Sequence, residues 1–358
     1  MPFIKEIEKY KSLSIVGLEK NTGKTECLNY VLSRLSGSTK QIALTSIGVD
    51  GENTDVVTQT HKPEIEVYEG MIFVTSELHY QKKNLVAEVL DVSTQSTSLG
   101  RLVTAKAKSS DKVMISGPAS NAAIKDLISQ MRNFNVDLTL VDGALSRKSL
   151  GSPAVTDAMI LATGAALSAN IPQLVYKTNY TYDLISLKAV GEELKERLLP
   201  IQKGIWAISE GGEFIDLEIE SVLLIEKAKD KLFKRGNRIF VNGAITDKFL
   251  NFLRVQKQIK DIEIIVRDFT RIFATPETYY AFIKRGGRIK VLQKTKLIAV
   301  CINPVSPDGY CLNSDELKQA MEEKLNLPVY NVRELSEHGT ERCIEPVEMS
   351  KSELRIDR

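Results

Sequence analysis

The sequence predicts an α/β protein in which a doubly wound, mostly parallel sheet with a β-rich insertion is followed by a second, smaller α/β domain. Short apolar runs alternate with amphipathic stretches, which is the pattern of strand–helix–strand units. The same alternation restarts near residue 203. The chain has 358 residues, 43% of them hydrophobic, and this is enough material for two cores.

The first strand and helix enclose a Gly-Lys-Thr loop. An apolar run at 13–16 precedes the loop, and apolar side chains recur at helical spacing after it, at Leu28, Val31, Leu32 and Leu35. A strand that passes through such a loop into a helix is typical of a phosphate-binding loop (P-loop), in which backbone N–H groups and a lysine surround phosphate oxygens. The spacing is unusual, because five residues rather than four separate Gly17 from Gly23.

The candidate nucleotide-binding residues form one continuous segment. Lys24 would place a cation on the outer phosphates, and Thr25 would offer an oxygen to Mg²⁺. The segment consists of Lys20, Asn21, Thr22, Gly23, Lys24, Thr25 and Glu26. We expect ATP with Mg²⁺, and GTP less, because the Asn-Lys-x-Asp signature of guanine-specific proteins is absent and residues 177–179, in an expected loop, match it poorly.

Three carboxylates are candidates for catalysis and for the metal. Asp142 closes the apolar run 138–141, where an acidic residue can hold Mg²⁺ opposite a P-loop. Asp50 and Glu52 follow the second strand, in a loop expected to face the γ-phosphate; the alternative is a solvated acidic loop. We assign Lys24, Asp50 and Asp142 to catalysis, and Thr25, Asp142, Asp50 and Glu52 to the metal.

The segments 116–118 and 144–148, the latter with Arg147 and Lys148, also follow strands and should lie at the same edge of the sheet.

The remaining elements are assigned from periodicity. We expect domains at 1–200 and 201–345, with the β-rich insertion at about 62–105 and a polar tail at 346–358. The first domain should contain a strand at 41–45, a β-hairpin at 63–76, strands at 85–92, 99–105 and 112–116, a helix at 119–134, a strand at 137–143, a helix at 153–169, a strand at 173–176 and a helix at 182–199. The second should contain strands at 205–208, 238–243 and 262–266, helices at 220–233, 247–255 and 276–283, strand-like runs within 289–301 and an amphipathic helix at 314–325.

Composition argues against several classes of partner. The chain has 48 Lys and Arg residues against 46 Asp and Glu residues, and it has no basic block, so we expect no nucleic-acid partner. No apolar run reaches membrane-spanning length, so we expect a cytoplasmic protein without a membrane partner. The four cysteines lack C-x-x-C pairing and the three histidines lie far from them, which argues against a metal cage or a disulfide framework. A homo-oligomer is left open.

Two resemblances to known families extend these expectations. The loop at 20–25 resembles that of the molybdopterin-guanine-dinucleotide biosynthesis adapter proteins, whose downstream pattern is not followed here. From the loop almost to residue 332, the chain is similar to the B subunit of the lysine 5,6-aminomutase reactivase. The segments that carry this resemblance are the loop itself, 28–30, 43–52, 62–63, 141–144 and 303–307.

The second resemblance implies a role beside an adenosylcobalamin-dependent aminomutase of amino-acid fermentation. Such radical enzymes stall with damaged cobalamin bound, and a reactivase uses nucleotide energy to release it. The resemblance also implies a MutS-like ATPase subunit as a partner. We expect ATPase activity that is slow without a partner, because a partner can complete such a site. Two alternatives stay open: an ATP-dependent enzyme that activates a carboxylate, as dethiobiotin synthetase and the cobyrinate amidases do, and a non-catalytic nucleotide-binding adapter.

Overall fold

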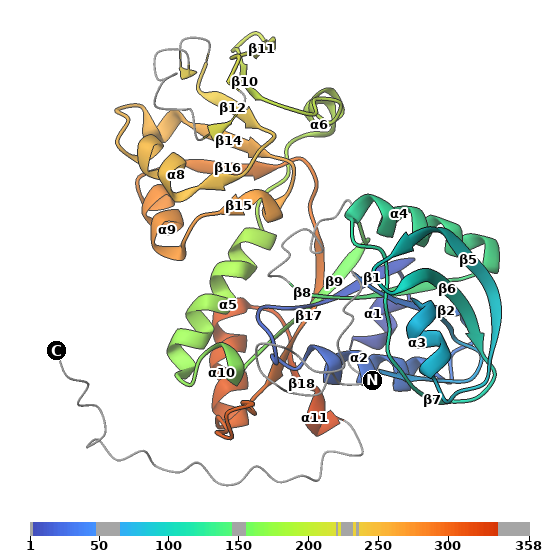
Figure 1. Cartoon of the computed structure of the whole chain (residues 1–358). Coiled ribbons are helices and arrows are strands. Elements are labelled where there is room, and N and C mark those ends of the chain that lie inside the picture. Colours follow the sequence, from blue (N-terminus) through green and yellow to red (C-terminus); the bar gives the residue numbers. More distant parts are fainter. Residues whose placement is uncertain are drawn as a thin grey trace. The chain divides into compact units, whose positions relative to one another are not determined.

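The computed structural model describes residues 3–47, 65–144, 155–219, 221–222, 232–233 and 236–335. These residues form two compact units (Figure 1). Unit 1 takes its residues from Met1–Leu150, Ala158–Thr178 and Leu297–Arg358, and unit 2 takes its residues from Gly151–Asp157 and Asn179–Lys296. The main part of unit 2 is therefore inserted in the chain between two parts of unit 1.

A nine-stranded sheet forms the centre of unit 1, in the order β18-β17-β9-β1-β8-β2-β4-β6-β5 (Figure 1). β1 is parallel to both of its neighbours and β2 to both of its own, whereas β6 is antiparallel to β4 and β5. The strands of this sheet are β1 (Ser12–Gly17), β2 (Ile42–Ser46), β4 (Ile72–Ser76), β5 (Ala87–Thr97), β6 (Gly100–Ala107), β8 (Leu138–Ala144), β9 (Ala158–Gly164), β17 (Lys296–Asn303) and β18 (Val329–Asn331). The predicted α/β class with a large, mostly parallel sheet is confirmed.

Helices cover both faces of this sheet. Ile42 and Leu44 of β2 pack with α2 in the main core, whereas Ala43 between them packs with α4, because successive strand residues point to opposite faces. On the α4 side of the sheet, Thr163 of β9 is hydrogen-bonded to Thr178 of α5, with 3.0 Å between the hydroxyl oxygens. The helices of unit 1 are α1 (Ile4–Ile7), α2 (Lys24–Leu35), α3 (Glu77–Lys82), α4 (Asn121–Gln130), the first half of α5 (Ile171–Ile185), α10 (Ser314–Leu325) and α11 (Val332–Leu335), with 3₁₀ turns at Met131–Phe134 and Ala165–Leu167.

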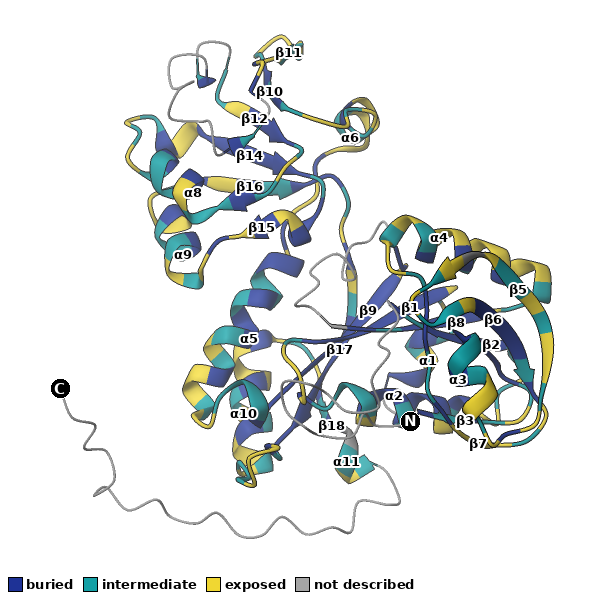
Figure 2. Ribbon diagram, in the orientation of Figure 1, coloured by how far each residue is buried: buried dark blue, intermediate teal, exposed yellow. Residues whose placement is uncertain are grey.

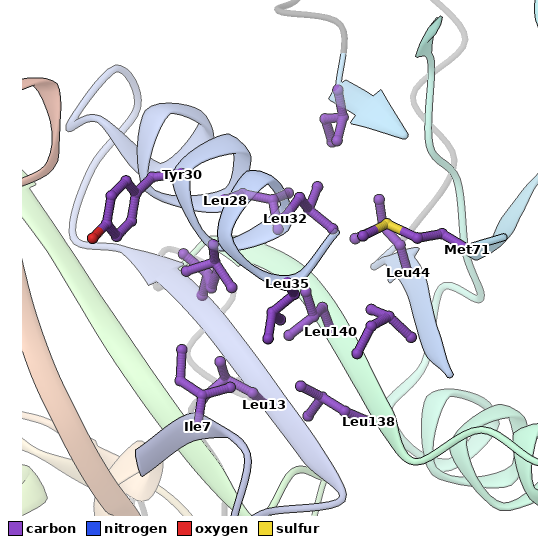
Figure 3. Close-up of a cluster of buried hydrophobic side chains, with 14 of the residues drawn as sticks. Ile7, Leu13, Leu28, Tyr30, Leu32, Leu35, Leu44, Met71, Leu138 and Leu140 are labelled. Atoms are coloured by element: carbon purple, nitrogen blue, oxygen red, sulfur yellow. The ribbon is translucent and has the colours of Figure 1, made fainter. Parts of the chain in front are cut away.

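The main core lies between α2 and the sheet (Figures 2 and 3). The four apolar positions of α2 that helical spacing predicted are all buried in it, and Cys27 and Tyr30 of the same helix join them. They pack against buried side chains of β1, β2 and β8, which include Leu13, Leu44, Leu138 and Leu140. Each such leucine contributes about 1.5–3 kcal/mol of transfer free energy, so this contact is the main attachment of α2.

The predicted β-rich insertion extends the main sheet and does not stand apart from it. Its strands β4, β6 and β5 continue the sheet beyond β2. The predicted hairpin at 63–76 is wrong, since β4 runs parallel to β2, and β3 (Ile65–Val67) pairs with β7 (Asp111–Val113). All five residues of β4 are buried, which suits a strand with a neighbour on each side better than one arm of a hairpin. The strand predicted at 112–116 ends at Val113 and is antiparallel to β3, and α3 was not predicted.

Two elements of the next segment were predicted with the wrong type, a helix in place of a strand and a strand in place of a helix. A helix was predicted at 153–169, but its described part contains β9, whose seven residues are all buried. Alanines favour a helix by propensity, yet a fully buried run between two strands is the pattern of a central parallel strand. The strand predicted at 173–176 lies inside α5, where Asn170 Oδ1 accepts a hydrogen bond of 2.9 Å from the N–H of Gln173. The helix predicted at 182–199 is two helices, because α5 ends at Ile185 and α6 (Glu192–Leu198) follows.

The chain returns to the first sheet after unit 2. β17 joins the sheet beside β9, and β18 pairs in parallel with β17. This division differs from the boundary predicted at residue 200, because 297–335 belong to unit 1. The pairing of β17 joins residues that are distant in the sequence, and local periodicity carries no information about such pairing.

Unit 2 is built on a five-stranded sheet in the order β11-β10-β12-β14-β16. β12, β14 and β16 are parallel, whereas β10 is antiparallel to both of its neighbours. The strands of unit 2 are β10 (Ile205–Ile208), β11 (Phe214–Asp216), β12 (Arg238–Val241), β13 (Ile245–Thr246), β14 (Glu263–Val266), β15 (Ile272–Phe273) and β16 (Arg288–Val291). Its helices are the second half of α5, α6, α8 (Asp247–Arg254) and α9 (Pro276–Lys284), with 3₁₀ turns at Ile259–Asp261 and Phe269–Arg271. The predicted strand at 205–208 and the helices at 247–255 and 276–283 are confirmed, while the helix predicted at 220–233 lies largely outside the described residues. Among the helices in the described ranges, none combines the length and the apolar character needed to cross a bilayer.

We expect Leu28→Ala to lower the free energy of unfolding of unit 1 by about 2–5 kcal/mol, because it leaves a cavity between α2 and the sheet. Urea unfolding followed by far-UV circular dichroism measures this change. Val86→Ala truncates a side chain that is 64% exposed and should change the free energy by less than about 0.5 kcal/mol. The single tryptophan, Trp206, lies in unit 2, so its fluorescence transition is an internal reference. Equal effects of the two variants would contradict the described core.

Candidate functional site

The loop from Leu18 to Gly23 connects β1 to α2 at the carboxyl end of the sheet strands. Two of its residues adopt left-handed backbone conformations, Asn21 with φ 59° and Gly23 with φ 86°. The hydroxyl of Thr22 donates a hydrogen bond of 2.8 Å to the carbonyl of Glu19 and closes the loop on itself. The predicted order of strand, glycine-containing loop and helix is therefore present.

The extra residue of the loop is accommodated by the sheet. The N–H of Leu18 donates a hydrogen bond of 2.9 Å to the carbonyl of Ala162 and so continues the ladder between β1 and β9 by one residue. Gly17 lies under the loop, where an added Cβ would be 2.9 Å from Thr22 Oγ1. The unusual spacing thus reflects a longer strand, and the turn itself begins at Glu19.

The first turn of α2 has no side-chain cap. Gly23 occupies the N-cap position, and it carries no side chain that could accept a hydrogen bond from the N–H groups that follow. Uncapped N–H groups and the positive end of the helix dipole favour an anion. Lys24, the first residue of α2, adds a full positive charge at the same point.

Lys24 forms an ion pair with Asp142. Its Nζ lies 2.9 Å from Oδ1 and 3.0 Å from Oδ2 of the carboxylate. The side chains are 26% and 13% exposed, so the pair is partly shielded from solvent. Of the predicted catalytic residues, the structure therefore brings Lys24 and Asp142 together.

Strand register explains why these two side chains meet. β8 lies directly beside β1, and Asp142 is paired with Ile15 of β1 and with Ser46 of β2. Leu138 and Leu140 point into the core below α2, and Asp142 is the next residue of the same alternation. Its carboxylate therefore lies on the α2 face of the sheet, at the end where α2 begins.

Asn303, the last residue of β17, lies against the loop. An added Cβ on Gly23 would be 2.6 Å from Asn303 Cβ, and an added Cβ on Gly164 would be 2.2 Å from the Asn303 carbonyl oxygen. Asn303 is thus held between the loop and the end of β9. The sequence singled out Asn303 only through a resemblance, although an asparagine after a buried strand is a signal that could have identified it.

Cys27 and Cys301 form a second contact between α2 and β17. Their sulfur atoms are 3.5 Å apart, and both thiols are buried and reduced. The four residue steps from Gly23 to Cys27 rise about 6 Å along a helix, and the two steps from Cys301 to Asn303 span about 6.6 Å along a strand. The two contacts therefore fit one straight alignment of α2 on β17.

The segment after β7 lies at the carboxyl end of β2, beside the site. Gly117 lies on the end of β2, where an added Cβ would be 1.7 Å from the carbonyl oxygen of Ser46. The hydroxyl of Ser116 is 2.9 Å from Nδ1 of the buried His79. Because Ser46 is paired with Asp142, the predicted approach of 116–118 to the site is consistent with these contacts.

The other predicted residues occupy different places. Lys20 and Asn21 are exposed on the loop, and Glu26 lies 3.6 Å from a guanidinium nitrogen of Arg333. Asp50, Glu52, Arg147 and Lys148 lie outside the described residues.

The expected loop at 177–179 is part of α5, so these residues do not form a base-binding loop. Lys177 donates to the carbonyl of Leu167, and Thr178 bonds Thr163. The amide of Asn179 donates to Asp183 and Tyr280.

The described residues can provide one carboxylate for a divalent ion at this site. Among them, no cluster of three or more His, Cys, Asp or Glu side chains could hold a metal by itself. Mg²⁺ is commonly held by one or two carboxylates together with substrate phosphates. Asp142 and the half-exposed Thr25 fit that arrangement.

No family model, curated protein or solved structure matches this chain in comparisons with known proteins. Support for a function therefore comes from the geometry of the loop and its neighbours.

We expect the thiols of Cys27 and Cys301 to react with a maleimide on the order of 100-fold more slowly than that of Cys311, because a buried thiol reacts only after local opening. The hydrogen-bonded Cys27 thiol and burial raise the pKa of Cys301, which keeps it protonated. Cys311 is partly exposed. Peptide mapping after timed labelling measures the three rates, and labelling in denaturant is the control. Fast labelling of Cys27 in the folded protein would contradict the contact.

Proposed function

We propose that this protein binds Mg-ATP at the loop between β1 and α2 and uses it as a switch. The observation that supports this most directly is the ion pair of Lys24 and Asp142 at the uncapped start of α2. A cation on the helix and a carboxylate on the adjacent strand are the two groups needed on either side of a metal-bound triphosphate.

The ion pair has a simple role in this proposal. Without nucleotide, Lys24 and Asp142 neutralise each other in a partly shielded place, where either charge alone would be unfavourable. On binding, Lys24 exchanges the carboxylate for phosphate oxygens, and Asp142 becomes available to Mg²⁺ directly or through water. The ion supplies neutralisation of phosphate charge. The exchange of partners makes the arrangement of the loop depend on the nucleotide.

We further propose that the switch serves the reactivation of an adenosylcobalamin-dependent aminomutase, together with a MutS-like ATPase subunit. The support for this is the sequence resemblance alone. In such a system, hydrolysis is slow until a partner completes the site. GTP is the less favoured nucleotide.

We expect Lys24→Ala to weaken the binding of Mg-ATP by about 10- to 100-fold, since the net loss is that of one charge-assisted hydrogen bond, about 1.5–3 kcal/mol. Isothermal titration calorimetry measures the dissociation constant. Lys125→Ala removes an exposed lysine of α4 and should leave the constant within about twofold. Equal affinities of wild type and Lys24→Ala would refute the proposed site.

ATP turnover measured with and without the aminomutase tests the wider proposal. Stimulation by that enzyme supports a reactivase. Stimulation by a small carboxylic acid instead would indicate the carboxylate-activating alternative, and tight binding without any phosphate release would indicate the adapter.

We expect Asp142→Asn to separate nucleotide binding from metal binding. The neutral amide frees Lys24, so ATP in the presence of a chelator should bind no more weakly than to wild type. The ratio of the ATP affinity with Mg²⁺ to the ATP affinity without it should fall towards one, because the carboxylate that holds the ion is lost. Titrations of ATP in EDTA and in Mg²⁺ give the dissociation constants without and with the ion. Asp126→Asn on the exposed face of α4 is the control. A full Mg²⁺ effect in Asp142→Asn would rule out Asp142 as a ligand.

A further inference from the structure

The sheet order indicates where the nucleoside should lie, if the proposed function holds. β8, with Asp142, lies on one side of β1, and β9 and then β17 lie on the other. The metal and the outer phosphates belong on the side of Asp142, so the sugar and base extend over β9 and β17. Strands are about 4.8 Å apart, which places the end of β17 about 10 Å from β1.

Asn303 is the polar side chain that the structure holds at that point. It is 9% exposed, and an added Cβ on Gly23 would be 3.5 Å from its Nδ2 atom. Its Oδ1 accepts a hydrogen bond of 3.2 Å from the N–H of Val305, as in an Asx turn. Among the described residues, none accepts a hydrogen bond from Nδ2 in this structure. The amide therefore has its acceptor occupied and its donor available beside the loop.

The segment that follows Asn303 is ordered by its own hydrogen bonds. Leu312 N–H donates to the carbonyl of Pro304, and Ser306 N–H donates to that of Tyr310, each over 2.9 Å. The hydroxyl of Tyr310 donates a bond of 2.7 Å to the carbonyl of Ala165, at the end of β9. The loop at 303–312 is thus fixed to the strand that separates β17 from β1.

We propose that the loop at 303–312 binds a purine base and that Asn303 Nδ2 donates a hydrogen bond to purine N7. Adenine and guanine both present N7 as an acceptor, whereas pyrimidines have no equivalent atom. An amide whose oxygen is already engaged can provide this donor and is not suited to the two-bond pairing with adenine, which also needs the oxygen. Asn303 is then the base-reading residue of the proposed nucleotide site.

The experiment compares ATP, 7-deaza-ATP, GTP, CTP and inorganic triphosphate, each with Mg²⁺, by calorimetry. Wild type should bind ATP and GTP about three- to tenfold more tightly than 7-deaza-ATP, which corresponds to one hydrogen bond. Asn303→Ser keeps a neutral oxygen for the Val305 N–H and removes the amide donor, so it should bind ATP and 7-deaza-ATP equally. Its affinity for inorganic triphosphate should remain that of wild type.

Asn331→Ser is the matched control. Asn331 ends the neighbouring strand β18 and is 5% exposed, but its Nδ2 already donates to Ser314 and Glu334. This variant should retain the preference for ATP over 7-deaza-ATP. Thermal unfolding of both variants checks that each is folded.

The outcomes separate the base-reading role from the proposed function. If inorganic triphosphate and ATP both fail to bind wild type, the proposed function fails. If triphosphate binds but ATP, 7-deaza-ATP and CTP bind alike, only the base-reading role is overturned. An equal loss of ATP and triphosphate binding in Asn303→Ser also overturns it, because the amide would then serve the phosphates.

Discussion

The packing of α2 against the sheet is the constraint on which the rest of unit 1 depends. The apolar face of the helix spans β1, β2 and β8 in one core, and Cys27 adds a contact with β17. This packing fixes the start of the helix above the carboxyl ends of several strands. Gly23, Lys24, Asp142 and Asn303 meet there because each lies at or near the end of an element that the core has already positioned.

This arrangement keeps two opposite charges, those of Lys24 and Asp142, partly shielded from solvent. An ion pair with side chains 26% and 13% exposed has lost part of its hydration, and the attraction between the charges only offsets that loss. The pair therefore contributes little net stability compared with the leucines below it. Its value is that two opposite charges are kept at fixed positions, close to a helix end that is itself positive. An anion with a divalent counter-ion can replace this pairing without leaving either residue unpaired.

Much of the site could be predicted from local sequence, but the strand pairing that places Asn303 beside the loop could not. The loop and the start of α2 follow from the glycine, the lysine and the helical spacing of Leu28, Val31 and Leu35, which are all local signals. Asp142 could be selected because it follows an apolar run. Asn303 depends on β17 returning to the sheet after unit 2, and no short-range pattern reports that pairing. The prediction also placed 177–179 in a loop, although the buried Thr178 belongs to α5, a helix that packs on β9.

The order of the elements along the chain has a consequence for biosynthesis. The ribosome delivers β1, α2, β8 and β9 first, then most of unit 2, and only afterwards β17 and β18. Until the last strands emerge, one edge of β9 is unpaired and Gly23 has no asparagine beside it. A truncated product that stops within unit 2 would carry the β1–α2 loop beside an open sheet edge, a surface prone to unwanted strand pairing. The late return of β17 thus delays completion of the site until the segment that follows unit 2 has been synthesised.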